Sequence, residues 1–427
     1  MSNGFIIAAP SSGAGKTMIT LGLLRAFRNR GIDVVSAKSG PDYIDPAFHQ
    51  AASGAACVNL DAWAMQPAQL RGLAHGQAGD LLLIEGAMGL FDGAPDAGDP
   101  LGRGSVADLA ETLSLPVILV LDASKQAQTA AAVVAGLAGF HSGVKIAGVI
   151  LNQVGSARHK DMLEAAIQTT GVPVLGAIPR TTDLAWPSRH LGLVQAQEDH
   201  VLEAFIQKAA ALLAANVDLD QLINIAAPIA NAPKTAGLPP LGQRIAVARD
   251  AAFAFSYPHM LAGWRQAGAE ISFFSPLLDQ IPDPSADAIF LPGGYPELYA
   301  GRLAGNQRFK AAMRAATAVI YGECGGYMML GEHLTDAKGI THKMLGLLPV
   351  STSFSERKLH LGYRNLTVLA GPLQGQYLKG HEFHYACITA QSNTGHLFAA
   401  SNSLSNSLDD IGHIRGNVSG SFAHIIC

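Results

Sequence analysis

The stretch APSSGAGKT, residues 9–17, decides the fold of the first half of the chain. It follows an apolar run that is typical of a buried strand, and it precedes a segment, starting at Lys16, whose apolar residues recur at helical spacing. A glycine-rich turn between a strand and a helix N-terminus is the setting of a P-loop, whose backbone amides point at phosphate oxygens. Only Pro10 departs from the standard pattern, which has its first glycine there. We therefore expect a nucleotide-phosphate site rather than a simple glycine turn.

Each residue of this loop has an expected role. Glycine lets the backbone curl around the phosphates, the lysine reaches the β- and γ-phosphate oxygens, and the threonine hydroxyl ligates Mg²⁺. The predicted ATP-binding residues of the loop are Ser12, Gly13, Ala14, Gly15, Lys16 and Thr17.

Apolar runs and helical patterns alternate through the first 225 residues. The runs at 80–89, 115–123 and 145–153 are predicted strands, and residues 16–31 and 126–140 are predicted helices. This βαβ order predicts a mostly parallel sheet with helices on both faces.

Polar side chains follow several of these strands, and ligands gather at the carboxyl ends of strands in an open parallel sheet. The segments 39–49 (SGPDYIDPAFH) and 84–93 (IEGAMGLFDG) carry most of them. The predicted Mg²⁺ ligands are Thr17, Asp42 and Glu85. The predicted substrate or carboxylate site contains Lys38, Asp45, Asp92 and Ser105. Asn152 is predicted to pair with a nucleobase edge. The alternatives are that the acids cap helices or turns, that Lys38 is a solvated surface charge, and that Asn152 forms an Asx-turn.

An Ala/Pro-rich stretch without clear periodicity, residues 226–242, separates two halves of the chain. Its composition suits an extended linker. Strand and helix patterns begin again after it, including a predicted helix over residues 251–268. We expect a first domain at 1–225 and a second α/β domain at 243–427.

The segment YGECGGYM, residues 321–328, places Cys324 between a predicted strand and a predicted helix in the pattern G-x-C-x-G. This is a nucleophile elbow with cysteine as the nucleophile: small neighbours permit a strained turn, and the helix N-terminus is expected to lower the thiol pKa. The N–H of Gly325 is a candidate oxyanion donor, with a second from Gly293 or Gly294.

A thiol nucleophile of this kind needs a general base, which is usually histidine. His424, His381 and His384 are comparable candidates from the residues alone. The two histidines of GHEFHY, residues 380–385, lack supporting cysteines, so zinc is not expected there.

Composition excludes several classes of protein. Hydrophobic residues make up 49% and charged residues 15%, which indicates a folded globular chain. A net charge of −4 without any Lys/Arg block argues against nucleic-acid binding, and no apolar run is long enough for a membrane span. The four cysteines are scattered, so a reduced, cytoplasmic location is expected.

With these motifs assembled, the sequence resembles the family of cobyrinic or hydrogenobyrinic acid a,c-diamide synthases. The resemblance runs almost end to end, through APSSGAGKT, SGPDYIDPAFH, EGAMGLFDG, VILNQVGSARH, RIAVARDAAFAFSY, LPGGYPELYA, GECGGYMML, GHEFHY and GSFAHI. It implies a P-loop domain similar to dethiobiotin synthetase, followed by a flavodoxin-like class I glutamine amidotransferase domain.

The resemblance also implies the chemistry. Cys324 attacks the amide of L-glutamine with His424 as base and acid, and a thioester forms and releases ammonia. MgATP phosphorylates a carboxylate of a corrin substrate, cobyrinic or hydrogenobyrinic acid, and ammonia displaces the phosphate to give the a- and c-amides. The resemblance favours a homodimer.

One position departs from triad-type glutaminases, which carry an acid two residues after the catalytic histidine. Ile426 stands there, so the group that orients His424 is not evident. Nickel-sirohydrochlorin a,c-diamide synthase and cobyric acid synthase are alternatives within the family. A P-loop partitioning or scaffold protein with an inactive glutaminase domain is the alternative from another class.

Overall fold

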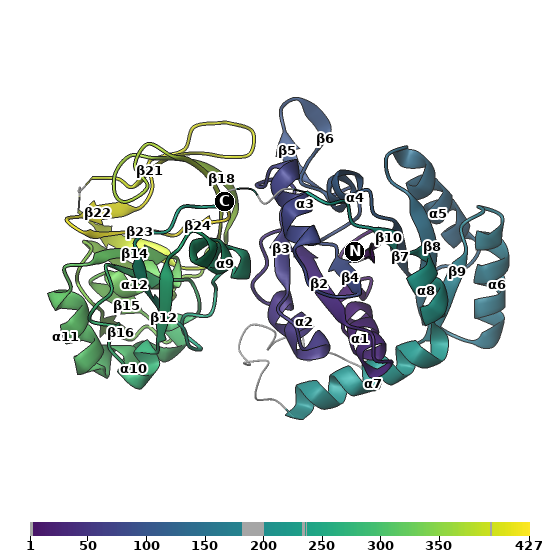
Figure 1. The fold of residues 1–427 in the computed structure, drawn as a ribbon, viewed down its shortest axis with the longest axis horizontal. Helices are drawn as coiled ribbons and strands as arrows, with labels where there is room; N and C mark the ends of the chain where they lie inside the picture. The colour runs from purple at the N-terminus through teal and green to yellow at the C-terminus, as the bar shows by residue number, and fades with distance from the viewer. Residues whose placement is uncertain (1–2, 182–199, 233–234, 236, 393–394) are drawn as a thin grey trace. The chain divides into compact units, whose positions relative to one another are not determined.

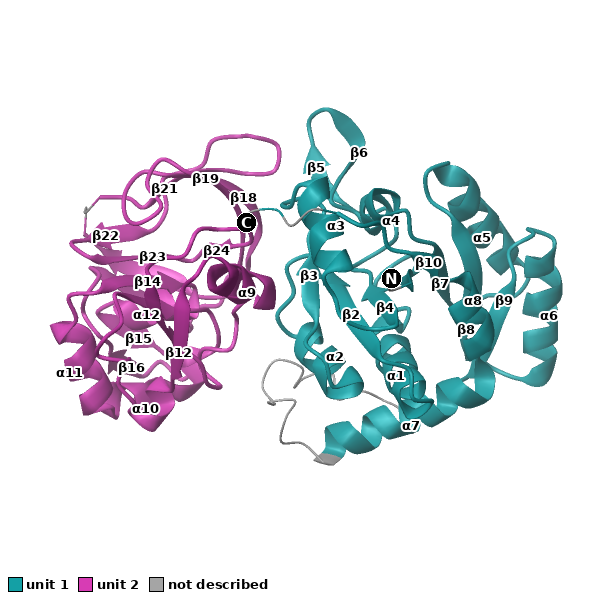
Figure 2. Cartoon of the chain, in the orientation of Figure 1, with its two compact units in different colours: residues 1–235 teal, residues 236–427 magenta. Residues whose placement is uncertain are grey.

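The computed structural model describes residues 3–181, 200–232, 235, 237–392 and 395–427. The chain folds into two compact units, Met1–Thr235 and Ala236–Cys427, which are coloured separately in Figure 2. Each unit is an α/β structure with its own hydrophobic core.

The first unit is built on a parallel sheet (Figure 1). Its strands are, in spatial order, β3 (Val58–Leu60), β2 (Val34–Ser39), β4 (Leu81–Glu85), β1 (Asn3–Ala8), β7 (Val117–Asp122), β8 (Ile146–Val154) and β9 (Val174–Pro179). β2 and β4 are buried along their whole length, because helices cover both faces of the sheet. The predicted strands and the predicted parallel arrangement are confirmed.

Eight helices are found in the described part of the first unit. They are α1 (Lys16–Asn29), α2 (Asp45–Ser53), α3 (Pro67–His75), α4 (Val106–Leu113), α5 (Thr129–Phe140), α6 (Ala157–Gln168), α7 (His200–Asn216) and α8 (Leu219–Ile225). The apolar stripe of α1, which includes Ile19, Leu23 and Phe27, packs in one core with Phe5 and Ile7 of β1. A hairpin, β5 (Ala94–Asp96) with β6 (Asp99–Arg103), follows β4.

The strand order places the predicted polar residues on one edge of the sheet. β4 lies between β1 and β2, so the P-loop after β1 is adjacent to the end of β4. In the β2–β4 ladder Lys38 is directly opposite Glu85, and in the β7–β8 ladder Asp122 is opposite Asn152.

The expected linker begins within the first unit. β10 (Ala227–Pro228) pairs antiparallel with the start of β1, opposite Asn3 and Gly4. The boundary between the units falls after Thr235. Residues 233, 234 and 236 of the expected linker lie outside the described residues.

The second unit has a flavodoxin-like central sheet. Its strands are, in spatial order, β12 (Glu270–Phe274), β11 (Arg244–Ala248), β13 (Ala288–Leu291), β14 (Val319–Glu323), β23 (Val418–Ser421) and β22 (His413–Arg415). The first five are parallel and follow the 2-1-3-4-5 order of doubly wound folds, whereas β22 is antiparallel to β23.

Two further four-stranded sheets complete the second unit. One consists of β16 (Thr341–Lys343), β15 (His333–Thr335), β17 (Val350–Ser353) and β20 (Cys387–Gln391). The other consists of β21 (Phe398–Ser401), β18 (His360–Val368), β19 (Tyr377–His384) and β24 (His424–Ile425). β24 brings the end of the chain against β19, where His424 pairs with His381.

The helix predicted over residues 251–268 is shorter than expected. α9 runs from Pro258 to Gln266, because proline is favoured in the first turn of a helix and disfavours helix in the residue before it. The preceding residues are not helical, and Phe255 forms a bridge with Gly293. The other α-helices are α10 (Ala300–Gly305), α11 (Gln307–Ala315) and α12 (Gly325–Leu330).

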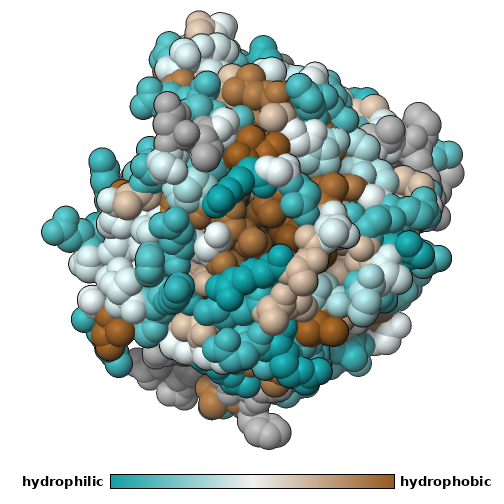
Figure 3. Space-filling view, turned by 90° about the vertical axis from the view of Figure 1, so that its left-hand side faces the viewer, coloured by the Kyte–Doolittle hydropathy of each residue, from teal (hydrophilic) through white to brown (hydrophobic). Residues whose placement is uncertain are grey.

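The molecular surface is largely polar on the face drawn in Figure 3. Hydrophilic side chains dominate its rim, and hydrophobic side chains gather in a central hollow. Across the described residues, no helix combines the length and the hydrophobicity that crossing a bilayer requires.

Candidate active sites

The predicted P-loop connects β1 to α1 in the structure. Gly13 and Gly15 have φ values of 82° and 93°, in the left-handed region that favours glycine. α1 begins at Lys16 with Gly15 as its N-cap, so the first amides of the helix face the loop. This is the backbone arrangement that phosphate binding requires.

Asn152, the residue predicted to pair with a nucleobase edge, contacts the P-loop. Its side chain is buried, and its amide nitrogen donates to the carbonyl of Ala14 at 2.9 Å. Its Oδ1 accepts from the N–H of the next residue, Gln153, at 2.9 Å, whereas an Asx-turn would use the N–H two residues on. A Cβ on Gly15 would lie 2.3 Å from Asn152 Nδ2. Asn152 therefore braces the P-loop from β8.

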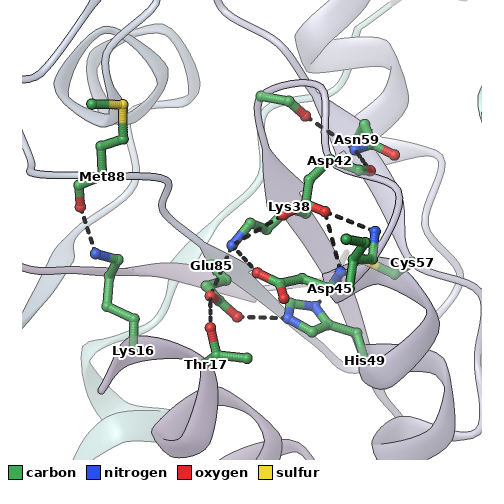
Figure 4. Close-up of polar contacts among 12 residues, drawn as sticks. Lys16, Thr17, Lys38, Asp42, Asp45, His49, Cys57, Asn59, Glu85 and Met88 are labelled. Carbon is green, nitrogen blue, oxygen red and sulfur yellow. Dashed lines mark hydrogen bonds and ion pairs between the residues drawn. The ribbon is translucent and has the colours of Figure 1, made fainter. Parts of the chain in front are cut away.

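Lys16 lies over the loop that follows β4. Its ammonium donates to the carbonyl oxygens of Met88 and Ser11 (Figure 4). Burial lowers the pKa of Lys16, while the charge of Glu85 raises it. The ammonium is therefore held at the mouth of the glycine loop by backbone oxygens.

A buried cluster of charged side chains lies beside the P-loop (Figure 4). Glu85, at the end of β4, accepts from the Thr17 hydroxyl at 2.8 Å and from the Lys38 ammonium at 2.8 Å. Lys38 also donates to Asp45 at 2.6 Å, and its side chain is 6% exposed. The alternative of Lys38 as a solvated surface charge is therefore wrong.

His49 completes this cluster and was not among the predicted site residues. It lies on α2 with no exposed surface, and its Nε2 contacts Glu85 Oε2 at 2.7 Å while its Nδ1 contacts Cys57 Sγ at 3.4 Å. Its position in SGPDYIDPAFH, four residues after Asp45 on one helix face, was the available sequence signal.

Charge pairing dominates the ionisation of the cluster. Burial lowers the pKa of Lys38, but Glu85 and Asp45 outweigh it and hold that pKa above its ordinary value. Burial raises the pKa of Glu85, but Lys38 and His49 outweigh it and hold that pKa below its ordinary value. Burial lowers the pKa of His49, but Cys57 and Glu85 raise it to about 10. Burial and Glu85 raise the pKa of Asp45 to about 6.

Three predicted site residues form hydrogen bonds with backbone N–H groups. Asp42 Oδ1 accepts from the N–H groups of Ile44 and Asp45 at the start of α2. Asp92 Oδ2 accepts from the N–H of Gly89 at 2.8 Å. Ser105 is the N-cap of α4 in a capping box with Asp108, and its side chain is buried. These contacts are the ones that the capping alternative expects of Asp42 and Asp92, and the roles of all three residues toward metal or substrate stay predictions.

The oxygen donors of the site suit magnesium. Thr17 and Glu85 offer a hydroxyl and a carboxylate, which are hard ligands. Among the described residues, no group of three His, Cys, Asp or Glu side chains is arranged to hold a metal ion. In nucleotide sites Mg²⁺ is usually held by one or two carboxylates together with phosphate oxygens of the nucleotide.

In the second unit, Cys324 adopts the predicted nucleophile elbow. It lies between β14 and α12 with φ 45° and ψ −101°, a strained conformation for a residue other than glycine. Its flanking glycines are required by close packing. A Cβ on Gly326 would lie 1.9 Å from the Leu291 carbonyl oxygen, and one on Gly322 would lie 2.6 Å from Leu330 Cδ1. The pattern G-x-C-x-G therefore has the physical basis that the sequence suggested.

The predicted oxyanion donors lie next to this elbow. A Cβ on Gly325 would lie 2.9 Å from the backbone nitrogen of Gly294, so the two backbones are in close contact. Gly294 itself has no room for a side chain, because a Cβ there would lie 2.1 Å from the Ala252 carbonyl oxygen. Both glycine turns thus converge beside Cys324.

The three candidate histidines have different surroundings. The ring of His424 packs on Gly293, where an added Cβ would lie 2.3 Å from its Cε1. His381 stacks on His424 with ring centroids 5.0 Å apart. His384 stacks on Phe422, and its Nδ1 donates to the carbonyl oxygen of Ala386 at 3.0 Å. Of these three, His424 is the ring that contacts the glycine turn of the predicted oxyanion site.

The thiol pKa contradicts the expectation from the helix N-terminus. Burial, followed by the charge of Glu297, raises the pKa of Cys324, and the N–H of Gly325 lowers it by less. Burial also raises the pKa of Glu297 to about 7. Burial, followed by His381 and His384, lowers the pKa of His424. These shifts favour the neutral thiol at Cys324 and the neutral imidazole, which is able to accept a proton, at His424.

Comparisons with known proteins define the class of each unit. Residues 5–194 match the CobQ/CobB/MinD/ParA nucleotide binding domain, and residues 244–427 match the CobB/CobQ-like glutamine amidotransferase domain. The chain thus consists of a P-loop nucleotide-binding domain joined to a CobB/CobQ-like glutamine amidotransferase domain.

Curated relatives match nearly the whole chain. Hydrogenobyrinate a,c-diamide synthases from Brucella anthropi and Mesorhizobium japonicum are each 53% identical and that from Rhizobium meliloti is 51% identical, with 99% of this chain and 98–99% of each relative covered. The chain belongs to the hydrogenobyrinate a,c-diamide synthase family. A glutamine amidotransferase crystal structure also matches 38% of this chain and 80% of its own, at 17% identity and a TM-score of 0.28.

Proposed function

We propose that this chain is an ATP-dependent, glutamine-hydrolysing ligase that amidates the a and c side-chain carboxylates of hydrogenobyrinic acid in cobalamin biosynthesis. The observation that carries the proposal is the strained Cys324 elbow, in the same chain as an intact P-loop. The curated relatives are hydrogenobyrinate a,c-diamide synthases, which supports the proposed substrate. A partitioning or scaffold protein has no need of a strained nucleophilic cysteine, so the elbow argues against that alternative.

In the first unit, the chain's residues position nucleotide and carboxylate. The P-loop amides and Lys16 bind the phosphates; Thr17 and Glu85 would hold Mg²⁺, which would neutralise phosphate charge. Lys38 keeps Glu85 and Asp45 ionised and in place. Transfer of the γ-phosphoryl group to the substrate carboxylate gives ADP and an acyl phosphate. Ammonia then attacks the acyl carbon, phosphate leaves, and the amide remains after loss of a proton.

In the second unit, Cys324 and His424 act on glutamine. The Cys324 sulfur attacks the side-chain amide carbon while His424 accepts the thiol proton, and the Gly294 and Gly325 amides receive the oxyanion. His424 returns the proton to the departing ammonia. Water then hydrolyses the thioester to glutamate and restores the thiol.

Product mass tests the substrate. The purified chain is incubated with ATP, Mg²⁺, glutamine and, in parallel, hydrogenobyrinic acid, cobyrinic acid, nickel-sirohydrochlorin or cobyrinic acid a,c-diamide. Each amidation replaces a hydroxyl with an amino group, so the product mass falls in steps. We expect two such steps with hydrogenobyrinic acid. Amidation of nickel-sirohydrochlorin or of the diamide instead would support one of the two family alternatives, and no change with any substrate would refute the assignment.

The nitrogen donor tests the division of labour between the units. Cys324→Ala is expected to lose glutamine-dependent amidation and to keep amidation driven by added ammonium. Loss of activity with both donors would contradict separate sites. A cytoplasmic location and a homodimer, which the family resemblance favours, stay predictions that fractionation and light scattering test.

A further inference from the structure

Triad-type enzymes carry an acid two residues after the catalytic histidine, and in this chain Ile426 occupies that position. Ile426 has an apolar, buried side chain, and its backbone bonds with Lys379 and His259. A carboxylate that orients the imidazole must therefore come from another element.

Glu323, at the end of β14 and directly before Cys324, occupies the required place. Its Oε2 lies 3.8 Å from His424 Nδ1, and both side chains are only 2% exposed. Its Oε1 accepts from the N–H of Ile425 at 3.1 Å. This hydrogen bond ties the carboxylate to the residue that follows His424, so β14 and β24 hold the pair together.

Glu323 faces Nδ1 of His424, and the proton on this nitrogen determines the tautomer of the imidazole. A histidine that takes a thiol proton at Nε2 must carry its own proton on Nδ1. A carboxylate facing Nδ1 favours that tautomer and stabilises the imidazolium that forms. The distance of 3.8 Å is an ion-pair contact rather than a hydrogen bond, and such catalytic contacts shorten when charge develops.

We propose that Glu323 is the positioning residue of the glutaminase site. Its carboxylate, one residue before the nucleophile, takes the place of the acid that triad-type enzymes carry two residues after the histidine. This inference rests on the proposed roles of Cys324 and His424. The proposal also links two adjacent residues at the end of β14. Residue 324 is the thiol nucleophile, and residue 323 is the acid that orients the general base.

Burial moves both groups toward their neutral forms. It raises the pKa of Glu323 to about 8, against the N–H of Ile425 and the Tyr321 side chain. Burial, followed by His381 and His384, lowers the pKa of His424. The carboxylate form of Glu323, which stabilises the imidazolium, is therefore populated as the pH rises through about 8, so the contribution of Glu323 to kcat is expected on the alkaline side.

Glu323→Gln tests the proposal because it keeps an oxygen for the Ile425 N–H and removes the charge. We expect kcat for glutamine hydrolysis to fall roughly 10²- to 10⁴-fold, the range of general acid–base effects, with the KM for glutamine unchanged. The alkaline rise of the kcat pH profile near the Glu323 pKa is expected to disappear. Ammonium-driven amidation is expected to equal that of the unaltered protein.

Two further variants distinguish an effect of the Glu323 charge on the imidazole from a general effect of replacing an acid in the second unit. Glu323→Asp keeps the charge and is expected to retain more of kcat than Glu323→Gln. Asp336→Asn, at an acid of the same unit whose Oδ2 lies 3.0 Å from His342 Nε2, is expected to leave kcat unchanged.

Each outcome decides the matter. Unaltered kcat and pH profile in Glu323→Gln, equal loss in the Asp and Gln variants, or loss of ammonium-driven amidation would each overturn the proposal. Glutamine-dependent activity retained in Cys324→Ala would instead refute the proposed function itself.

Discussion

Gly326→Ala adds one methyl group to the first turn of α12, two residues after the nucleophile. The new Cβ would lie 1.9 Å from the Leu291 carbonyl oxygen and 2.6 Å from its carbonyl carbon. Both are backbone atoms of β13, an interior strand of the sheet, so no side-chain rotation relieves the clash.

The structure sets the size of the effect. To reach the 3.4 Å of an ordinary contact, α12 must move by roughly 1.5 Å away from β13. Overpacking of this kind costs about 1–3 kcal/mol of folding free energy. A displacement of about 1 Å at a catalytic group lowers the rate roughly 10²-fold, so glutamine hydrolysis is expected to fall by at least that factor.

The assay compares glutamine with ammonium as nitrogen donor, together with urea unfolding. Ammonium-driven amidation is expected to stay unchanged, because the altered residue lies in the other unit. Gly263→Ala is the matched control: in α9 an added Cβ meets no atom within 4 Å, and the change is expected to stabilise by about 0.5–1 kcal/mol. A Gly326→Ala protein with normal glutamine hydrolysis and stability would refute the packing argument.

Two further predictions concern buried charge. The pKa of His49 is raised to about 10, so the folded state holds a proton that the unfolded state releases above pH 6.5. The contribution of His49 to the free energy of unfolding is therefore full below pH 6.5. It declines by up to about 1.4 kcal/mol per pH unit as the pH rises toward 10. Hydrogen exchange in β2 and β4 across this range should show the decline in the unaltered protein and a shallower one in His49→Gln; identical slopes would contradict it. Because the charge of Glu297 raises the Cys324 pKa, Glu297→Gln is expected to lower that pKa and to speed alkylation of Cys324 at a fixed pH. Peptide mass spectrometry follows the reaction at Cys324, and slower alkylation would show that the sign is wrong.

The order of neighbouring residues in the sequence was sufficient to predict the features of the fold that depend on short-range contacts. The P-loop and the elbow are short turns whose glycines are needed at set spacings by backbone strain and close packing, and both lie where the sequence placed them. Strands β1, β4, β7 and β8 were likewise legible as continuous apolar runs, because both faces of a parallel sheet are buried.

The roles of single polar residues were less predictable. Ser105, Asp42 and Asn152 have side chains that suit either ligands or hydrogen bonds to the backbone, and sequence does not distinguish the two. The raised pKa of Cys324 was also missed, because burial and Glu297 depend on elements distant in sequence.

The sequence by itself determined the class of fold, through the alternation of strand and helix patterns, and it determined the phosphate loop and the cysteine elbow, since each of these turns is encoded within about a dozen contiguous residues. Only the tertiary structure decided the partners of the charged groups. Strand order places Lys38 opposite Glu85, and the return of β24 to β19 brings His424 beside Glu323, which precedes it by about a hundred residues. Ion pairs and catalytic contacts act over a few ångströms in space, and the distance between their members along the chain carries no information about that separation.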